Sequence, residues 1–471
     1  MKSFLTPLAL LLLAAPAFAQ TQADTDKRIA DLEKKVALLS KSESKDDDLK
    51  GAGFNVKFTG RVFLDGTYFS GGNYKLTNGA FLRVARLGWK ATLGNNWYGE
   101  GELDFSLNAI GVKDMWAGYT GFKDTLIQVG HFKEPFGMDT LMSDSNIFCM
   151  ERSFTDSWTP SRHIGVGVAK WGERWQGKVA FFGQAIDDTS DAQEVADTPA
   201  QDPTAVQTAG KAFPKLVTYK ITDNQGWGAA ARFTFLPVAV ADNKFVHLGL
   251  AVAQRTPNAG APGDYTWDFS CRPGTNKQSK AKFLNAAVTN VDKLSQTGAE
   301  FAGQWGNLSW QSEYQQSQVK RRDTQMLVWN GVSQVATTAA VQLASTVDHK
   351  FSTYYGQVAY VFGGQRRYDN GDAFFKGVTP NGKNGAWEIV ARYNVMNQDD
   401  KTAIDPVLGG IEKNTTLGLN YYVNKYLRFM LNYTTVKNNE NAMASKAYSA
   451  TGAKIPSDNF NYTNMRVAVT F

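Results

Sequence analysis

The feature that most constrains this chain is a two-residue alternation of apolar and polar side chains over much of its length. In residues 427–434, Leu427, Phe429 and Leu431 alternate with Arg428 and Asn432, and similar runs occupy 54–68, 97–107, 246–255 and 387–395. A period of two predicts β-strands with one apolar and one polar face. Such strands suit a soluble sandwich, whose apolar face points inward, or a membrane barrel, whose apolar face points outward.

The lengths of the segments separate these two folds. The alternating runs extend over about ten residues, as a tilted transmembrane strand requires, whereas soluble strands average about five or six. Short turns at 94–96, 121–124, 172–174, 306–307 and 424–425 alternate with long polar insertions near 134–162, 186–225, 256–295, 321–351 and 437–461. We therefore predict an all-β fold, a transmembrane antiparallel β-barrel of about sixteen strands. Two connections break the rule, the long link 363–384 and the short loop 109–113.

The first residues have the pattern of a secretory signal peptide. Lys2 precedes an apolar stretch from Leu8 to Ala15, and an Ala17-Phe18-Ala19 cleavage site follows. The apolar stretch is shorter than the ~20 residues that a membrane-spanning helix needs. We predict a signal peptide at 1–19, export to the periplasm, and the outer membrane of a Gram-negative bacterium as the destination.

Residues 20–50 differ in composition from the rest of the chain. Ile29, Leu32, Val36 and Leu39 follow the spacing of a coiled coil over about two heptads, and a charged linker runs from Ser40 to Lys50. This predicts a short periplasmic coiled-coil helix before a barrel domain at 51–471. The same pattern also suits an amphipathic helix that docks nowhere.

The chain ends within an alternating run, on Phe471. A closed barrel must pair its last strand with its first, so that no strand edge meets lipid. A terminal aromatic residue also resembles the signal that the bacterial barrel-assembly machinery recognises. We therefore expect that machinery and outer-membrane lipid as partners.

Composition excludes several classes of protein. The net charge of +6 is too small to indicate nucleic-acid binding, and no metal-ligand spacing or nucleotide motif suggests a cofactor. Only four histidines are present, and none has a convincing Ser/Asp arrangement beside it, so we expect no enzyme. A ligand-gated transporter would need a globular plug before the barrel. Cys149 and Cys271 could pair or remain free.

The polar face of a barrel lines its lumen, so its charges set selectivity. Alternation assigns basic and acidic residues to that face. The basic ones include Arg61, Arg86, Lys90, Arg232, Arg255, Arg392, Arg428 and Arg466, and the acidic ones include Asp65, Glu100, Glu102, Asp104, Glu300, Glu313 and Glu388. These residues could guide anions or brace neighbouring strands. Strict alternation with Arg86 puts Arg83 on the lipid face, where a charge is unfavourable. A bulge in the strand, or a position of Arg83 above the bilayer, would avoid this.

The insertion at 134–162 is unusually apolar for an external loop. It contains Phe136, Met138, Met142 and Phe148, and a solvated loop has no need of them. We predict that it folds into the barrel and narrows it, with Lys133, Arg152 and Arg162 near the constriction.

Several motifs resemble the phosphate-selective porins of the O/P type, over nearly the whole barrel. They are Phe81-Leu82-Arg83 with Arg86-Leu87-Gly88-Trp89, Asp104, Asp114, Tyr119-Thr120-Gly121-Phe122, the Gly130 to Arg152 stretch, Val246–Leu250, Gly385–Glu388, Arg392-Tyr393, Thr416–Tyr422 and Met465–Phe471. The resemblance implies a sixteen-stranded trimer, an inward third loop and arginines that guide anions. Two lysines of phosphate-specific members are replaced, one by the Asp139-Thr140 stretch and one by Tyr98, while Arg83, Asp114 and Arg152 match.

From these observations we predict an outer-membrane porin, a passive diffusion channel for small hydrophilic solutes that favours anions such as phosphate. The alternatives are a general or weakly cation-preferring porin, one for organic acids or sugars, and a structural or adhesive outer-membrane protein. The pore-lining and anion-pathway residues are predicted to be Arg61, Arg83, Arg86, Lys90, Asp114, Lys133, Arg152, Arg162, Arg232, Arg255, Arg392, Arg428 and Arg466.

Overall fold

The computed structural model describes residues 49–51, 53–73, 76–106, 110–183, 226–257, 267–274, 282–288, 291–321, 327–329, 334–336, 348–401, 406–443 and 457–471. The signal peptide predicted at 1–19 and the helix predicted within 20–50 lie outside these ranges, except for β1 (Leu49–Gly51) at the end of the linker. The chain forms two compact units, Met1–Lys57 and Phe58–Phe471. In the first unit, β1 pairs with residues 54–56 at the start of β2.

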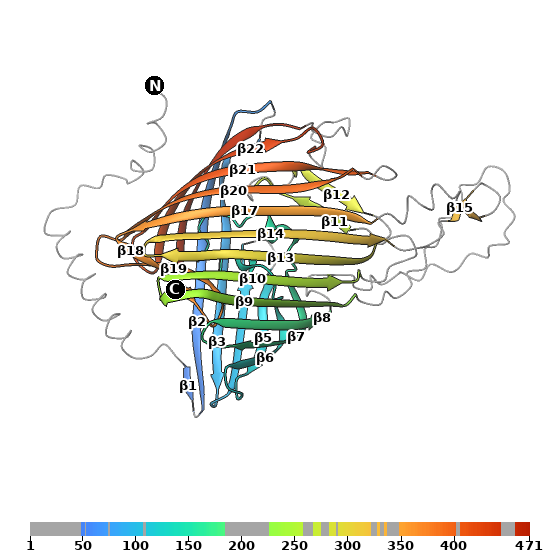
Figure 1. Ribbon diagram of the computed structural model, residues 1–471. Coiled ribbons are helices and arrows are strands. Elements are labelled where there is room, and N and C mark those ends of the chain that lie inside the picture. Colours follow the sequence, from blue (N-terminus) through green and yellow to red (C-terminus); the bar gives the residue numbers. More distant parts are fainter. Residues whose placement is uncertain are drawn as a thin grey trace, which may run out of the picture. The chain divides into compact units, whose positions relative to one another are not determined.

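Sixteen antiparallel strands form a closed barrel (Figure 1), which confirms the predicted fold class. They are β2 (Phe54–Ser70), β3 (Gly79–Leu93), β4 (Trp97–Asp104), β5 (Gly111–Tyr119), β6 (Thr125–Lys133), β7 (Arg162–Trp171), β8 (Trp175–Phe182), β9 (Gly228–Ala241), β10 (Lys244–Arg255), β13 (Val291–Trp305), β14 (Leu308–Arg321), β17 (His349–Phe362), β20 (Ala386–Asp400), β21 (Val407–Tyr422), β22 (Leu427–Asn438) and β23 (Phe460–Thr470). The ring closes where β23 pairs with β2, from Arg61 opposite Thr470 to Ser70 opposite Asn461.

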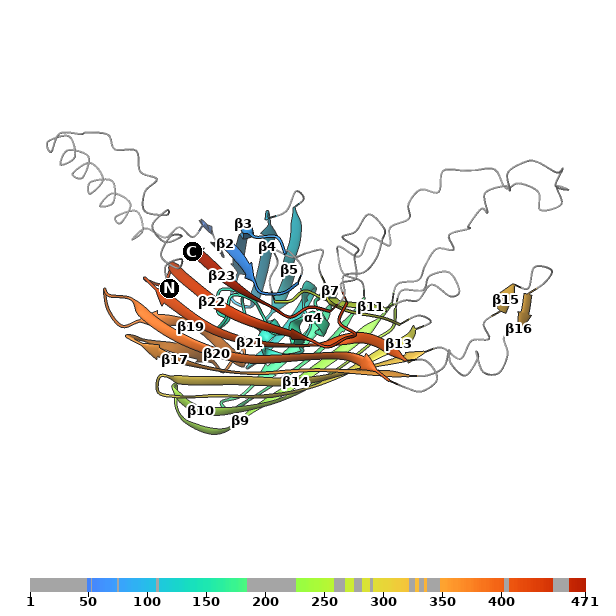
Figure 2. The same ribbon diagram turned by 90° about the horizontal axis from the view of Figure 1, so that it is seen from above.

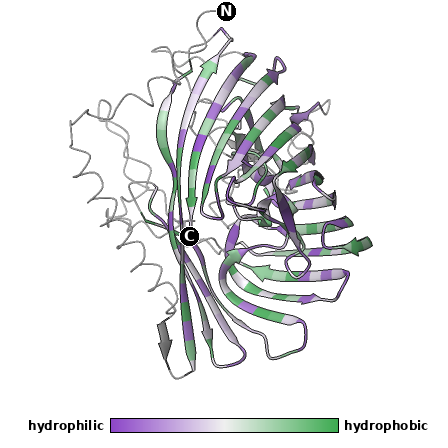
Figure 3. Ribbon diagram, turned by 90° about the vertical axis from the view of Figure 1, so that its left-hand side faces the viewer, coloured by the Kyte–Doolittle hydropathy of each residue, from purple (hydrophilic) through white to green (hydrophobic). Residues whose placement is uncertain are grey.

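The alternation along the strands gives the barrel an apolar outer face. In Figure 3, hydrophobic (green) and hydrophilic (purple) segments follow one another along individual strands. Leu250 is 66% exposed and Leu417 is 59% exposed, and both lie on the outer face. The inward polar residues are buried, as Gln296 and Asn420 show, because chain segments fill the lumen. The outward apolar residues are therefore those that a bilayer covers.

Three segments between strands pack inside the ring. The first, named here the lumen loop, is residues 134–161 between β6 and β7, with the short helices α3 (Met138–Leu141) and α4 (Thr155–Trp158). The second is the hairpin of β11 (Trp267–Cys271) and β12 (Leu284–Val288). The third, named here the lumen hairpin, is β18 (Gly364–Asp369) paired with β19 (Phe374–Pro380). Figure 2 shows α4 and β11 close together within the ring of strands.

The lumen hairpin explains one of the two irregular connections. It occupies the link between β17 and β20, where a short turn was expected. The link is long because it contains the two strands of this hairpin, which folds back into the barrel. The other irregular connection, between β4 and β5, is short, as the sequence indicates. A further pair, β15 (Leu327–Trp329) and β16 (Gln334–Ala336), forms its own small sheet. Neither helix in the described ranges is long and apolar enough to cross a membrane.

Candidate functional site: the constricted lumen

The lumen loop is anchored at its first turn by a carboxylate of the barrel wall. Gly137, with φ of 71°, turns the chain into α3. The two backbone N–H groups that follow, those of Met138 and Asp139, donate to Glu313 of β14 at 3.0 and 2.7 Å. Tyr355 of β17 donates its hydroxyl to the same carboxylate at 2.6 Å. With a further bond from the Gln311 side chain at 3.3 Å, four donors reach this buried carboxylate, and two of them hold the turn in place.

The apolar side chains of the lumen loop form its second attachment. Met138, Met142 and Phe148 are at most 1% exposed and pack with residues of the wall and of the lumen hairpin. The Phe148 and Phe375 rings meet edge to face at 5.3 Å between centroids. On the other side, Trp158 meets Phe269 of β11 at 5.8 Å. The lumen loop therefore lies between the two hairpins and contacts both.

One group of basic wall residues forms ion pairs where β2 to β4 face the lumen loop. Arg61 contacts Glu102 and lies 2.8 Å from Asp144 of the lumen loop. Arg86 contacts Asp104 at 2.8 Å, and also Glu102 and Asp144. Arg61 and Arg86 thus share two acidic partners, and through Asp144 they tie the loop to the wall.

Arg83 faces the lumen despite the alternation that places it on the lipid side. Leu82 and Leu87 are both exposed although five positions apart, so the alternation is interrupted between them. Arg83 contacts Glu151 of the lumen loop at 2.7 Å, and Arg466 of β23 reaches the same carboxylate at 3.0 Å. Arg466 also pairs with Asp65 at 2.7 Å.

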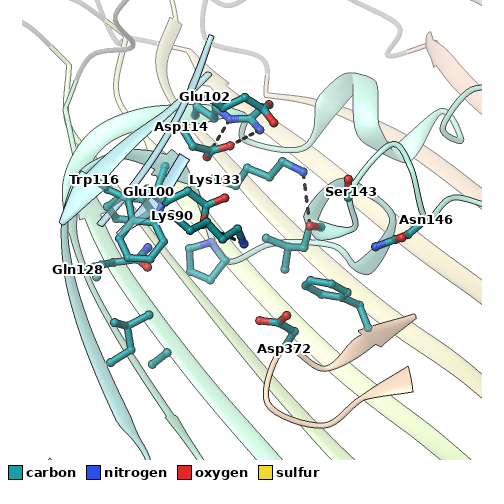
Figure 4. Close-up of a pocket in the computed structure, with 18 of the residues that line it drawn as sticks. Lys90, Glu100, Glu102, Asp114, Trp116, Gln128, Lys133, Ser143, Asn146 and Asp372 are labelled. Carbon is teal, nitrogen blue, oxygen red and sulfur yellow. Dashed lines mark hydrogen bonds and ion pairs between the residues drawn. The ribbon is translucent and has the colours of Figure 1, made fainter. Parts of the chain in front are cut away.

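The matched residue Asp114 pairs with Arg162, at 3.0 and 2.7 Å (Figure 4). Near them, Lys133 extends toward the lumen loop and donates to the carbonyl oxygens of Thr140 and Met142 at 2.5 and 3.0 Å. No carboxylate of the described residues forms an ion pair with Lys133. Its charge is therefore balanced by backbone dipoles.

The opposite wall has two fully buried arginine–glutamate pairs, both in contact with the lumen hairpin. Arg232 of β9 pairs with Glu300 at 2.7 Å and donates to the carbonyl oxygen of Ala373 at 2.9 Å. Arg366 of β18 pairs with Glu388 of β20 at 2.7 Å, and its guanidinium lies 3.8 Å from the centroid of the Phe148 ring. These pairs brace the hairpin against the wall and the lumen loop.

The remaining predicted residues also point inward. Arg152 donates to the carbonyl oxygens of Asp139 and Met142, Arg392 to that of Glu151, and Arg428 to that of Ile147. Arg255 lies over the Trp267 ring at 5.3 Å. Lys90 is 3.5 Å from Glu100. All thirteen predicted residues are thus on the lumen side, and most of their charges engage protein groups.

Two cavities lie beside the lumen loop. The larger has a volume of about 490 Å³ and lies between β2–β8, the lumen loop and the lumen hairpin (Figure 4). Six basic and four acidic side chains line it: Arg61, Lys90, Lys133, Arg162, Lys178 and Lys376, with Glu100, Glu102, Asp114 and Asp372. The smaller cavity, of about 270 Å³, has four basic and two acidic side chains: Arg83, Arg152, Arg272 and Lys282, with Glu151 and Asp156.

Lys178 of β8 was missed in the sequence although its position carries a signal. Val179 and Phe181 are exposed to the outside, so the same alternation directs Lys178 inward. It lines the larger cavity and has no hydrogen bond or ion pair with any described residue. Asp144 and Arg366 were also missed, because both lie in connecting segments to which no strand period applies.

The electrostatics of Asp144 lead to a prediction about pH. Burial would raise the pKa of this carboxyl, but Arg61 and Arg86 hold it well below its ordinary value of 3.8. A lowered folded-state pKa contributes stability that is fully present above about pH 3.8 and is lost as the pH falls through the lower, folded value. Asp144→Asn should therefore cost ~2 kcal/mol at pH 7 and at pH 5 alike. Urea unfolding in detergent at both pH values measures this, and a cost confined to pH 7 would contradict it.

Neither cysteine forms a disulfide. Cys149 lies in the lumen loop and Cys271 in β11, both as buried free thiols. The hydroxyl of Ser157 is 3.1 Å from the Cys271 sulfur. Among the described residues no group of His, Cys, Asp and Glu side chains is suited to hold a metal ion.

Comparison with known sequences identifies the family. The family described as phosphate-selective porin O and P matches residues 56–466. This chain belongs to that family. Family and barrel together place the porin in the outer membrane of a Gram-negative bacterium. A protein of Caulobacter vibrioides is 25% identical over 365 residues, covering 75% of this chain and 62% of that relative, so the chain spans less than two thirds of the relative's length.

The chain also shows a distant structural similarity to solved outer-membrane proteins. An anion-selective porin from Comamonas acidovorans is 12% identical, with 89% of this chain and 100% of that chain covered and a TM-score of 0.48. The outer-membrane channel DcaP of Acinetobacter baumannii is 11% identical, with coverages of 90% and 99% and a TM-score of 0.47. OmpT of Vibrio cholerae in its trimer form is 9% identical, with coverages of 89% and 100% and a TM-score of 0.47.

Proposed function

We propose that the chain is a passive diffusion channel for small hydrophilic solutes and that it favours anions. The observation that carries this is the charge of the lumen: in each of the two cavities beside the lumen loop, basic side chains exceed acidic ones by two. Lys178 contributes to this surplus, because it forms no hydrogen bond or ion pair with a described residue and interacts with the nearby Asp372 carboxylate only at longer range. A surplus of fixed positive charge at a constriction raises the local anion concentration.

The anion preference that we propose is broad, extending to phosphate and to small carboxylates, without a dedicated phosphate site. The lysine that the resemblance leads one to expect in the lumen loop is replaced by the Asp139-Thr140 stretch. The Asp139 carboxylate accepts bonds from the backbone N–H and the hydroxyl of Ser153 at 2.7 and 2.8 Å, so it organises the loop from within. Asp114, which matches the family, forms an ion pair with Arg162, so the two charges neutralise each other.

The second candidate function is a general or weakly cation-preferring porin. Glu100, Glu102 and Asp114 line the larger cavity together with its cations, and most wall arginines are paired with carboxylates. In this alternative, the paired charges of the lumen mainly hold the wall and the internal segments together and have little effect on ion preference. The wider proposal also includes the signal peptide at 1–19, the short coiled coil within 20–50, the barrel domain at 51–471, a homotrimer, and recognition of Phe471 by the assembly machinery.

Reversal potentials across a planar bilayer with a KCl gradient test the ion preference. We expect the sign of an anion-selective pore. Lys178→Glu should lower the anion-to-cation permeability ratio severalfold, because it converts the surplus of two positive charges in the larger cavity to none. Lys170→Gln, a change on the outer face of neighbouring β7, is the matched control and should leave the ratio unchanged.

A cation-selective wild type would contradict the proposal, and so would a Lys178→Glu variant with the wild-type ratio. Low concentrations of phosphate should reduce chloride conductance no more than equal concentrations of acetate or succinate do. A selective block by phosphate would instead indicate a dedicated phosphate site.

A further inference from the structure

Five lysines face outward on one side of the barrel, near the ends of the strands remote from Phe471. Lys293, Lys320, Lys350, Lys413 and Lys437 lie on β13, β14, β17, β21 and β22, and together they are named here the outer lysine row. Strand alternation places each of them on the face that carries the exposed apolar side chains. Four are exposed and Lys293 is half-buried.

The strand register groups these lysines closely. Lys293 is directly opposite Lys320, and Lys413 is directly opposite Lys437. Lys350 is opposite Gln318, two residues from Lys320, so it is a diagonal neighbour of the first pair. Directly opposite residues have Cβ atoms about 5 Å apart, and like charges in such pairs are destabilising unless an anion lies between them.

No described acidic residue supplies that anion. The carboxylates near these strand ends are Asp292, Asp348, Asp399, Asp400 and Glu440, and none forms an ion pair with the outer lysine row. Three of them are engaged elsewhere. Asp348 accepts from Gln318 and the Arg321 backbone, Asp399 from Asn439 and Asn441, and Asp400 from the Lys350 backbone N–H.

Aromatic side chains mark the depth of the row relative to the bilayer. The outward residues Tyr314, Tyr354 and Tyr433 lie four to six positions from the lysines on β14, β17 and β22, on the side toward the barrel middle. Aromatic girdles sit at the membrane–water interface. The lysines therefore lie at the level of the lipid headgroups. The lysines lie at the strand ends that lead into the long connections, which are extracellular in such barrels, so this is the headgroup layer of the outer leaflet.

The described strands on the other side of the barrel have no such group of lysines. At the same end, the exposed outward residues of β2, β3, β7 and β8 include Tyr68, Leu82, Ile164 and Phe181, and β5 has a single outward lysine, Lys113. The outer lysine row is thus a local feature of the wall from β13 to β22, and it is not a general property of the rim.

We propose that the outer lysine row binds the phosphate groups of the outer-leaflet glycolipid, the lipopolysaccharide, which then forms a specific lipid contact on the β13–β22 wall. Phosphate monoesters on a saccharide present the compact double charge that two opposed ammonium groups match. Basic clusters at a membrane surface attract anionic headgroups with ~1 kcal/mol per lysine. The inference rests on placement in the outer membrane and is independent of ion selectivity.

Titration of the purified barrel with lipopolysaccharide in detergent, followed by native mass spectrometry and by the thermal unfolding midpoint, tests the proposal. We expect Lys413→Gln/Lys437→Gln to bind about thirtyfold more weakly than wild type, and Lys293→Gln/Lys320→Gln/Lys350→Gln to lose binding further. Lys170→Gln/Lys244→Gln removes two outward lysines at the periplasmic end and should bind as wild type does.

Chemically dephosphorylated lipopolysaccharide should bind wild type as weakly as the variants bind the intact lipid. Equal binding of intact lipid by wild type and the Lys413/Lys437 variant would overturn the proposal, as would equal binding of the dephosphorylated lipid. Conductance in phosphatidylcholine bilayers, which contain no glycolipid, should be the same for every variant. That measurement confirms folding, and it separates failure of this inference from failure of the channel proposal.

Discussion

Arg366→Ala is expected to release the lumen hairpin and raise the single-channel conductance severalfold. Arg366 is fully buried, donates to Glu388 from two of its three guanidinium nitrogens, Nε and Nη2, and covers the Phe148 ring of the lumen loop. Its removal leaves the Glu388 carboxylate buried without its cation, which costs ~3–5 kcal/mol. Arg366 also donates to the carbonyl oxygens of Asn146 and Lys376. The substitution therefore also removes the hydrogen bonds that join the hairpin to the lumen loop and its two strands to each other.

Conductance in planar bilayers and urea unfolding measure the two consequences of Arg366→Ala. The double variant Arg366→Met/Glu388→Met is the matched control, since replacing both members of a buried pair with apolar residues is often nearly neutral. We expect it to unfold close to wild type and to conduct less than the single variant. If Arg366→Ala has wild-type conductance, the hairpin is not held by this pair.

Glu313→Ala is expected to free the first turn of the lumen loop and to make the open-channel current markedly noisier. The substitution strands the buried N–H groups of Met138 and Asp139 and the Tyr355 hydroxyl, each of which now donates to Glu313. A buried donor left without its acceptor costs ~1–3 kcal/mol. Because these three donors lose their acceptor together, the attachment of the turn to β14 is weakened, and the loop should sample positions away from the wall.

Glu313→Gln provides the graded comparison. It keeps one acceptor oxygen in nearly the same volume, so its current noise and its loss of stability should fall between wild type and the alanine variant. Current-noise spectra and protease accessibility of the loop in the folded barrel report its mobility. A glutamine variant as noisy as the alanine variant would show that charge, and not hydrogen bonding, holds the turn. A quiet alanine variant would contradict the anchor.

The charged residues of the lumen have two different roles. Arg232, Arg366 and Arg466 are buried with carboxylates and hold the internal segments to the wall. Lys178 lines the larger cavity and forms no ion pair with a described residue, and we propose that it acts on permeating solutes. Under this proposal bracing and guidance, the two alternatives that the sequence leaves open, belong to different residues.

The fold class and the identity of the inward face could be predicted from the sequence because both depend on local periodicity. A side-chain period of two specifies which residues share a face, whatever the neighbours. That rule placed Arg61, Arg232 and Arg466 in the lumen. It failed at Arg83, where the alternation is interrupted between Leu82 and Leu87.

Only the tertiary structure decided which lumen charges are neutralised and what fills the barrel. Arg466 meets Asp65 across 401 positions of sequence, and Glu313 meets Asp139 across 174. The link 363–384 appeared only as a break in the pattern, yet it carries Arg366 and a hairpin inside the lumen. Connecting segments have no period of their own, and their positions follow from packing against strands distant in the chain. The alternation of the strands therefore determined the wall and its two faces, whereas long-range ion pairs and loop packing determined the shape and charge of the pore.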